Sequence, residues 1–472
     1  MSTLSVFEAA REAPQKPAIV LEGRVVNHAE LAERVRARLP ALAPLRDRPP
    51  HSFVSVAAPS TLASLELIHA LMANEVPFLP LHERLTASER AALLERLGPA
   101  FHIDGDDERT ELTPLLGVQS LPGAADGPEA PLALIMTSGT TGAPRAALLS
   151  RRAFHASARA SADNLGWRAD DRWLLCLPLA HIGGLSVVTR CLLARKPLVL
   201  ADSWQHASSG EALLGALVDG RATLVSVVPT QLSRLLQLVP TAEPLPAPLR
   251  AILTGGAATP ASLLAECSAR GWPVLTSYGS SEACSQIATQ SPGESPLAGG
   301  CGRPLAAVSV RIDPEGRIQL KGPTLFSGYH PGAADPFETD GWLRTQDLGR
   351  FDADGVLHVL GRADEVIISG GENVAPWEVE RALESCPGVR QACVFGVVDE
   401  RWGQAVAAAL LLEPGTREAT LARVREHVRR ELAGYKAPRV VVFDPSLPRE
   451  DSGKLFKRRI RDRYWAEAGR SI

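Results

Sequence analysis

The sequence predicts an α/β protein with a large N-terminal domain of layered sheets and helices, including a β subdomain, and a small C-terminal α+β domain. Three observations predict this. Short apolar runs alternate with amphipathic segments, the pattern changes to short strands and turns from about Ala307, and a boundary follows near Gly361–Glu365. With 472 residues the chain can form two or three such units. We therefore predict domains at residues 1–362 and 363–472.

Buried strands are predicted where apolar runs end in Gly, Pro, Ser or Thr, as at Ala133–Met136, Leu224–Val228 and Ala251–Thr254. Short apolar runs without alternation are typical of strands covered on both faces, so we expect parallel pairing. The segments between them have helical spacing, which is the pattern of βαβ units. The predicted helices include Ser60–Met72, Glu211–Val218 and Pro229–Leu238.

The second half of the chain has a different pattern. Turn sequences at Pro314–Gly316 and Ala353–Gly355 separate short strands and indicate the antiparallel β subdomain. Beyond residue 362 the same reasoning predicts two helices and three strands. The helices are expected at Glu378–Ser385 and Ala419–Leu432, and the strands at Val389–Val398, Val406–Leu412 and Val440–Phe443.

Composition excludes several classes of function. Fifty Lys and Arg against 53 Asp and Glu give a net charge of −3, so no basic field favours nucleic acid or an anionic membrane. The most apolar stretch, Leu174–Leu193, contains Pro178, His181 and Arg190, which argues against a membrane span. The N-terminus meets charge before any apolar signal region, and the seven cysteines show no CxxC spacing. We therefore expect a cytoplasmic protein.

A loop rich in glycine and hydroxyl residues follows the strand that ends at Met136. Such a loop offers free N–H groups and hydroxyls to a polyphosphate, and Arg145 at its end adds a cation. The Gly-Lys-Ser/Thr of a Walker A loop is missing, and an ordinary surface turn is the alternative. The candidate phosphate ligands are Thr137, Ser138, Gly139, Thr140, Thr141 and Gly142.

This string resembles the phosphate loop of the ANL superfamily of adenylate-forming enzymes, which includes acyl- and aryl-CoA synthetases. Tyr278-Gly279-Ser280-Ser281-Glu282 is similar to the family's Tyr-Gly-x-Thr-Glu element. The resemblance implies that the Tyr278 ring stacks on adenine, that Ser281 touches phosphate and that Glu282 helps to hold Mg²⁺, with Gly279 also among the nucleotide-binding residues. It also implies a mobile C-terminal domain, with the active site between the domains.

Three later motifs extend the resemblance to the end of the chain. Gly341-Trp-Leu-Arg-Thr-Gln-Asp347 and Gly361-Arg362-Ala-Asp364 are similar to the family's ribose-binding and hinge elements. They imply that Asp347 binds ribose, that Arg362 contacts the nucleotide and that Asp364 is the hinge. The loop with Gly370 and Gly371 resembles the lining of the pantetheine channel. The final motif, Pro448-Arg-Glu-Asp-Ser-Gly-Lys454, implies that Lys454 bridges the substrate carboxylate and the α-phosphate during adenylation.

Three positions depart from the family pattern. Arg145 stands where Lys is usual, Ser281 where Thr is usual and Gln346 where Gly is usual. The first two keep the charge or the hydroxyl, although a guanidinium is wider than an ammonium. Gln346 is expected to add bulk beside Asp347. A nucleotide-binding homologue without catalytic activity is therefore an alternative.

Two features limit the choice of acid substrate. The segment Leu177–Leu185 and Arg190 most resemble the corresponding sequence of the o-succinylbenzoate–CoA ligases of menaquinone biosynthesis. One carboxylate of this diacid is activated, and Arg190 is a suitable partner for the other. His181 is expected to position the acyl group, and aryl-CoA ligases for benzoate- or anthranilate-like acids are the alternative. The reaction requires ATP and Mg²⁺, with CoA as the acceptor in preference to a carrier-protein thiol. The other pocket walls are predicted at Gly255, Gly256, Ala257, Thr276 and Ser277.

Overall fold

The chain falls into two compact units, Met1–Val310 with Leu320–Leu343 and Arg311–Gln319 with Arg344–Ile472. Helices and mixed sheets make up both, as the predicted α/β class requires. The predicted division into domains at residues 1–362 and 363–472 stays a prediction. The computed structural model describes residues 3–21, 23–105, 109–122, 127–137, 145–201, 210–240, 243–245, 247–332, 336–399, 401–413, 416, 421–445, 447–448, 455 and 457–467.

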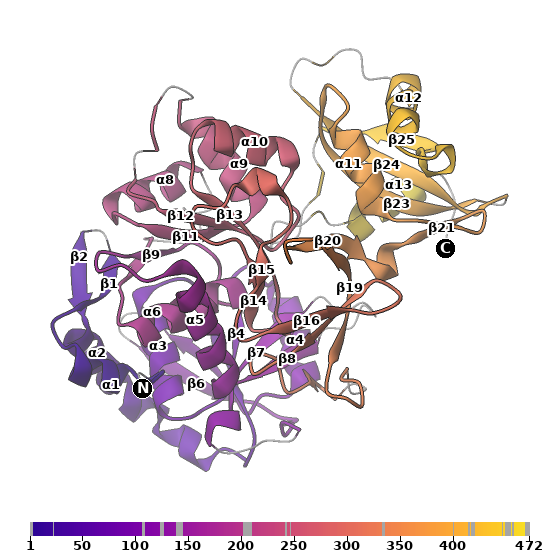
Figure 1. The fold of residues 1–472 in the computed structure, drawn as a ribbon. Helices are drawn as coiled ribbons and strands as arrows, with labels where there is room; N and C mark the ends of the chain where they lie inside the picture. Colours follow the sequence, from indigo (N-terminus) through magenta and orange to yellow (C-terminus); the bar gives the residue numbers. More distant parts are fainter. Residues whose placement is uncertain are drawn as a thin grey trace. The chain divides into compact units, whose positions relative to one another are not determined.

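The first unit contains a nine-stranded sheet, with β1 and β2 toward its outer edge in Figure 1. Six adjacent strands of this sheet run parallel, and antiparallel pairs lie beyond them at both edges. This confirms parallel pairing for the two predicted strands that lie here. In sheet order the strands are β15 (Arg303–Pro304), β14 (Ser285–Thr289), β13 (Val274–Ser280), β12 (Ala251–Thr254), β11 (Leu224–Val227), β9 (Trp173–Leu175), β10 (Leu198–Leu200), β1 (Pro17–Leu21) and β2 (Arg24–Asn27).

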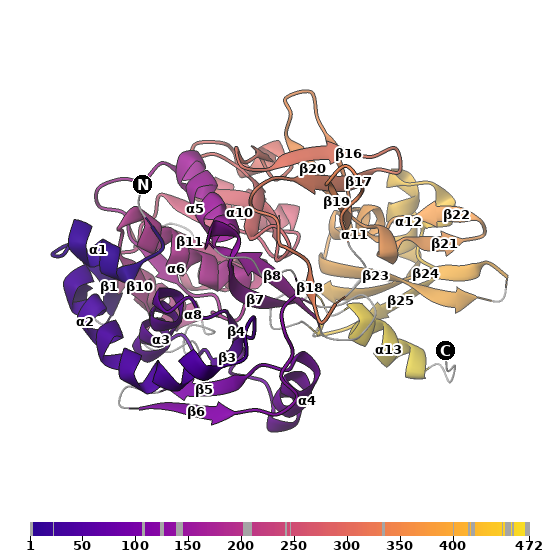
Figure 2. The same ribbon diagram turned by 90° about the horizontal axis from the view of Figure 1, so that it is seen from below.

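A seven-stranded sheet is the second layer of this unit. Its strand β7 pairs parallel with β4 but antiparallel with β8, so the parallel pairing predicted for Ala133–Met136 holds on one side only. Figure 2 shows the hairpin of β5 and β6 at one edge. In order the strands are β18 (Tyr329–His330), β8 (Arg145–Ser150), β7 (Pro131–Thr137), β4 (Phe78–Leu81), β3 (Val54–Ala57), β5 (Phe101–Gly105) and β6 (Thr110–Pro114).

Helices pack on these sheets, and local sequence sets their ends. Thr86 and Glu89 form a capping box at the start of one helix, and Pro229 is the first residue of another, where its missing N–H costs nothing. The helices are α1 (Val6–Glu12), α2 (His28–Arg38), α3 (Leu62–Ala73), α4 (Ala87–Leu97), α5 (Arg151–Leu165), α6 (Ile182–Ala194), α8 (Gly210–Asp219), α9 (Pro229–Leu238) and α10 (Ala261–Ala269).

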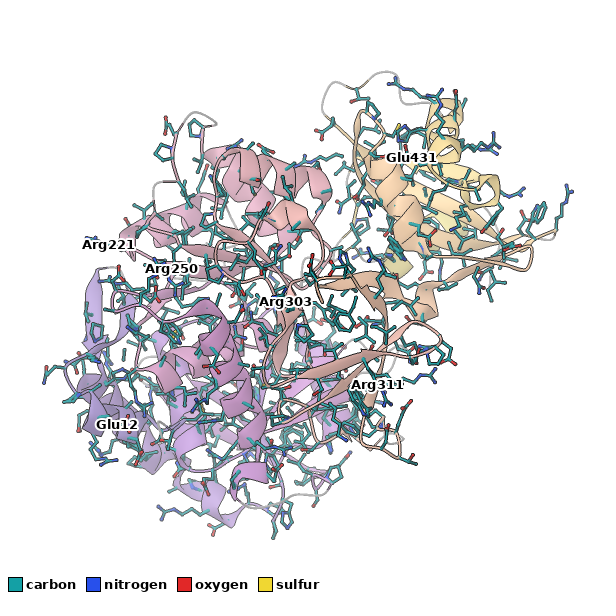
Figure 3. The ribbon with its side chains drawn as sticks, in the orientation of Figure 1. Glu12, Arg221, Arg250, Arg303, Arg311 and Glu431 are labelled. Carbon is teal, nitrogen blue, oxygen red and sulfur yellow. The ribbon has the colours of Figure 1, made fainter. Side chains whose placement is uncertain are left out.

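The core between α8, α9 and the nine-stranded sheet is apolar, with Val225 and Ile252 of the sheet packed in the same cluster as Leu217 and Leu232 of the helices. One ion pair lies at its margin. Asp171 is buried and accepts hydrogen bonds from Arg250, which is labelled in Figure 3, at 2.7 and 2.6 Å. Hydrogen bonds from Arg250, Thr223 and the Arg168 amide outweigh burial and lower the pKa of this carboxyl group. The pair stays charged and fixes the loop before β9.

The second unit contains a C-terminal sheet and most of a four-stranded sheet. The four-stranded sheet has the order β16 (Ser309–Ile312), β17 (Arg317–Lys321), β19 (Leu343–Phe351) and β20 (Leu357–Arg362), which confirms the predicted short strands and turns. The C-terminal sheet has the order β22 (Glu372–Val374), β21 (Ile367–Ser369), β24 (Gly403–Leu412) and β23 (Val389–Asp399), with β25 (Val440–Phe443) paired parallel to β24. Its helices are α11 (Pro376–Glu384), α12 (Leu421–Glu431) and α13 (Lys457–Glu467).

Strand β23 shows why helices cover both faces of the C-terminal sheet. Val394 packs in one apolar cluster with Leu383 of α11 and Val428 of α12, whereas Cys393 packs in a second cluster with Ile460 of α13. Adjacent strand residues point to opposite faces, so a strand buried throughout needs a helix on each side. The predicted helices and strands of this region are confirmed, apart from residues 419 and 420, which lie outside the described ranges.

Candidate active site

The ends of the predicted phosphate loop are held together. Thr137 at the end of β7 and Arg145 at the start of β8 are register partners, and the Thr137 hydroxyl donates to the Arg145 carbonyl at 3.2 Å. The loop therefore begins and ends at the same point of the seven-stranded sheet. The predicted ligands Ser138, Gly139, Thr140, Thr141 and Gly142 lie outside the described residues, so their role stays a prediction.

Arg145 and Glu282 both contact Tyr329, a residue that the sequence analysis did not single out. The Arg145 guanidinium carbon lies 3.9 Å from the centroid of the Tyr329 ring, and the Tyr329 hydroxyl donates to Glu282 Oε1 at 2.9 Å. Tyr329 is one of only four tyrosines in the chain and stands between Gly328 and His330-Pro331. That context signals a turn, but the partners of the ring depend on tertiary structure.

The segment Tyr278–Glu282 ends strand β13 and turns into β14, which runs antiparallel to it. Gly279 is required there, because a Cβ at this position would lie 1.9 Å from the Ser285 carbonyl oxygen. Tyr278 and Ser281 are half-buried on the turn. The residues of this predicted nucleotide motif thus stand on one tight hairpin.

The predicted walls of the acid pocket lie on neighbouring strands. Gly255 follows β12 directly, and a Cβ there would lie 3.1 Å from the carbonyl oxygen of Ser277 on β13. Gly256 adopts a φ of 77°, which favours glycine, and Ala257 continues the same loop. The Thr276 hydroxyl donates to the Gly300 carbonyl at 2.8 Å, so it supports the wall.

His181 and Arg190 belong to one helix but lie far apart on it. His181 is the N-cap of α6, and its ring centroid is 5.5 Å from that of His82. Nine residues along a helix correspond to a rise of about 14 Å. Arg190 therefore lies deeper in the unit, although long helical side chains lean back toward the N-terminus.

The Arg190 side chain is buried, with an exposed fraction of 3%. Its Nη2 donates to the Ser285 hydroxyl at 3.1 Å, and its guanidinium lies 5.3 Å from the Trp173 ring centroid. Burial lowers the pKa of Arg190 to about 10, so it is still a cation at neutral pH. Within the described part of the chain no carboxylate forms an ion pair with it, and its Nε has no hydrogen-bond partner. A buried cation of this kind is a ready partner for an anionic ligand.

In the second unit the structure brings together Asp347, Arg362 and Asp364. Arg362 donates to both carboxylate oxygens of Asp364 at 2.9 Å, and its Nη1 lies 3.6 Å from Asp347 Oδ1. Burial opposes the charge of Arg362, but the carboxylates of Asp364, Asp347 and Glu365 raise its pKa. Arg362 thus stays charged beside the Asp347 carboxylate, and the ribose role of Asp347 stays a prediction.

Gln346 does not crowd Asp347 as the sequence suggested. Its side chain is exposed and accepts a hydrogen bond from Arg317 Nη1 at 2.8 Å. Gln346 and Asp347 are adjacent on strand β19, so their side chains point to opposite faces. The expectation of added bulk beside the carboxylate is corrected on this point.

Gly370 and Gly371 form the turn of the β21–β22 hairpin, with φ values of 64° and 87°. Two consecutive residues with positive φ are typical of a type I′ turn. The Gly370 amide donates to the Trp402 carbonyl, and a Cβ on Gly370 would lie 2.5 Å from the Trp402 ring. The turn therefore explains why glycine occurs at both positions, and their role in binding pantetheine stays a prediction. Lys454 lies outside the described residues.

Two further observations bear on ligands. No group of three or more His, Cys, Asp or Glu side chains suited to a metal ion occurs in the described ranges. Of the helices that the structure describes, none has the length and apolarity to cross a membrane.

Comparison with known proteins finds relatives that share one named activity. A 2-succinylbenzoate–CoA ligase of Bacillus licheniformis is 41% identical over 69% of both chains, and one of Bacillus cereus is 33% identical over 95% of both. The solved o-succinylbenzoate CoA synthetase from Bacillus subtilis, in complex with its acyl-adenylate intermediate, has a TM-score of 0.84 and 31% identity, with 98% of both chains covered.

The family described as AMP-binding enzyme matches residues 6–330, and its C-terminal domain matches residues 378–454. The first match alone covers more than half of the 472 residues. The chain belongs to the family of AMP-binding enzymes.

Proposed function

We propose that the chain is an AMP-forming acid–CoA ligase whose acid is o-succinylbenzoate. In the first half-reaction a carboxylate oxygen attacks the α-phosphorus of ATP, which forms the acyl-adenylate and releases pyrophosphate. In the second, the CoA thiolate attacks the acyl carbon, and AMP leaves with the electron pair of the broken C–O bond. The relatives named 2-succinylbenzoate–CoA ligase support this reaction, as does the solved relative bound to ATP and magnesium.

The residues of the chain divide between the two ends of the nucleotide. Thr137, residues 138–142 and Arg145 bind phosphate, and the Tyr278 ring stacks on adenine. Asp347 holds the ribose, and Arg362 contacts the nucleotide. Lys454 stabilises the charge that develops during adenylation, and His181 positions the acyl group.

Glu282 fits the role of the magnesium ligand. Its Oε1 is fixed by the Tyr329 hydroxyl, and no hydrogen bond or cation from the described residues reaches its Oε2. A half-buried carboxylate with one oriented oxygen and one open oxygen is what a hard cation requires. When bound, Mg²⁺ would neutralise phosphate charge, while Glu282 holds it in place.

Arg190 is the observation that carries the choice of acid. It is a buried guanidinium with no carboxylate partner in the described ranges, and it reaches Ser285 next to the Tyr278–Glu282 hairpin. An acid with a second carboxylate would supply the missing charge, whereas benzoate would not. A diacid is therefore favoured over the monocarboxylate aryl acids.

The proposed setting is menaquinone biosynthesis in the cytoplasm. All seven cysteines are free thiols, and burial raises the pKa of five of them, Cys176, Cys191, Cys267, Cys284 and Cys393, above the ordinary thiol value. Free, unreactive thiols are typical of a reducing compartment.

The test is pyrophosphate release by the purified protein with ATP and Mg²⁺, with and without CoA. The acids are o-succinylbenzoate, benzoate, anthranilate, salicylate and a medium-chain fatty acid. We expect turnover with o-succinylbenzoate and a product of acyl-CoA only when CoA is present. Preference for a monocarboxylate would reassign the substrate, and silence with every acid despite ATP binding would favour a homologue without activity.

Arg190→Met isolates the role of the guanidinium. We expect kcat/KM for o-succinylbenzoate to fall about 100-fold or more, since truncating one partner of a buried charge pair costs several kcal/mol. The same acid without its ring carboxylate should be turned over equally by both proteins. The fold should persist, because an apolar side chain replaces a buried charge without a carboxylate partner. Equal losses for both acids would remove Arg190 from substrate recognition.

A further inference from the structure

We propose that Tyr329 is a positioning residue for adenylation, which separates and orients the cation of the phosphate loop and the carboxylate that holds Mg²⁺. The inference rests on the proposed function, since it assumes the roles given above to Arg145 and Glu282. It goes beyond them because Tyr329 belongs to none of the motifs that define the site. One ring serves both charged groups, through its face and through its hydroxyl.

The face of the Tyr329 ring positions the Arg145 cation. The Arg145 guanidinium lies 3.9 Å from the ring centroid, a distance at which a flat cation stacks on an aromatic ring. A guanidinium has a planar face and an ammonium does not, so Arg at this position uses the ring in a way that Lys would not. Nε of Arg145 is buried and has no hydrogen-bond partner among the described residues, which leaves it available to a ligand.

The hydroxyl orients the carboxylate. It donates to Glu282 Oε1 at 2.9 Å and leaves Oε2 to a metal ion. Arg145 and Glu282 form no ion pair in the described part of the chain, although both contact the same ring. A direct pair would neutralise the two groups that the phosphates and Mg²⁺ need. Tyr329 therefore keeps the opposite charges apart while it fixes both.

Tyr329 can do this because its own segment is held on two sides. Strand β18 pairs with β8, the strand that Arg145 begins, with Tyr329 opposite Ala147. The amide of Phe326 donates to the Glu282 carbonyl at 2.8 Å, and the Phe326 ring packs edge-on against Tyr329 at 4.7 Å. Backbone hydrogen bonds thus tie the segment to both partners of the ring, which is how a supporting residue sets geometry.

The test compares Tyr329→Phe, which keeps the ring and removes the hydroxyl, with Tyr329→Leu, which removes both. Tyr435→Phe is the matched control, since Tyr435 is exposed and lies in the second unit. Binding of ATP is measured by calorimetry without metal and across a Mg²⁺ titration. Pyrophosphate release is measured across the same titration.

For Tyr329→Phe we expect ATP binding without metal to match wild type and the half-saturating Mg²⁺ concentration to rise about 10-fold, with kcat restored at high Mg²⁺. Tyr329→Leu should in addition weaken metal-free ATP binding about 3- to 10-fold, because the Arg145 guanidinium loses the aromatic ring on which it stacks. Arg145→Lys should show that second defect alone, and combining it with Tyr329→Leu should weaken metal-free binding no further.

Glu282→Gln separates the two possible failures. If it leaves the Mg²⁺ dependence unchanged, the proposed role of Glu282 is wrong, and the inference falls with it. If Glu282→Gln raises the Mg²⁺ requirement but Tyr329→Phe behaves like wild type, the assignment of Tyr329 is overturned while the proposed function stands. A Tyr329→Leu protein that binds metal-free ATP normally would show that the Tyr329 ring does not position Arg145 for ATP binding.

Discussion

Gly279 is the residue where the fold and the proposed nucleotide site constrain each other most tightly. A Cβ there would lie 1.9 Å from the Ser285 carbonyl oxygen, closer than any relaxed contact. Ser285 also accepts the hydrogen bond from the buried Arg190. A shift of this turn would therefore disturb the Glu282 end and the Arg190 end of the site together.

Gly279→Ala should lower the free energy of unfolding by about 1–3 kcal/mol, the usual cost of overpacking, and weaken ATP binding. Gly215→Ala is the control, since Gly215 lies within α8 with nothing within 4 Å of an added Cβ. That change should stabilise the protein by roughly 0.5–1 kcal/mol and leave binding unchanged. Thermal denaturation with and without Mg·ATP measures both. A Gly279→Ala protein as stable as wild type would show that the turn can relax.

At the scale of elements, a small charge network ties the last helix to the segment after β20. Lys457 at the start of α13 lies 2.8 Å from Glu365 and 3.0 Å from Glu380 of α11. Burial disfavours the ammonium, but these two carboxylates raise its pKa. The network fixes the residue three positions after the predicted catalytic Lys454, next to the predicted hinge Asp364.

Lys457→Met should lower the melting temperature of the second unit, because two carboxylates lose their cation. We expect the free energy of unfolding to fall by about 1–3 kcal/mol, a loss between those typical of exposed and of buried ion pairs. Arg430→Met is the matched control, since Arg430 pairs with Glu426 on the exposed face of α12 and should contribute less than about 0.5 kcal/mol. Equal effects for the two variants would contradict a structural role for Lys457.

At the scale of the whole molecule, two buried histidines are expected to make stability depend on pH. His28 of α2 and His69 of α3 line one small cavity, and burial lowers the pKa of each to about 4. Neighbouring charges add to this, Arg195 for His28 and His28 for His69. Each ring is thus neutral in the folded state and protonates near 6.5 in the unfolded chain.

Between pH 6.5 and 4 the unfolded chain binds protons that the folded chain does not, so stability falls as pH falls through this window. The shift of His69 corresponds to roughly 3 kcal/mol once the pH is near 4. Denaturant unfolding at pH 7, 5.5 and 4.5 should show a steeper loss for wild type than for His69→Gln. Parallel curves would mean that other groups carry the acid sensitivity.

The proposed reaction also makes a prediction for the complete enzyme. Lys454→Ala should strongly reduce adenylation, measured as pyrophosphate release, because a cation at the reacting centre is lost. Transfer of the acyl group from supplied acyl-adenylate to CoA should be spared. Equal loss of both half-reactions would contradict the role given to Lys454 and the predicted rotation about Asp364.

Much of the fold followed from local patterns. Apolar run lengths predicted β11 and β12, and helical spacing predicted α3, α8 and α9 to within a few residues. These succeeded because each run has to be buried whatever its neighbours are. Pairing was less predictable, since β7 has a parallel and an antiparallel neighbour and nothing in its own residues distinguishes the two.

For the site, the sequence by itself determined the resemblance to the family, because several of the family's motifs occur in it in order between residues 134 and 454. Tertiary structure alone decided that Tyr329 joins Arg145 to Glu282, that Arg190 is buried without a carboxylate partner in the described ranges, and that Gln346 turns away from Asp347. Such contacts join residues from different elements. They depend on how strands pair and helices pack, which no local pattern records.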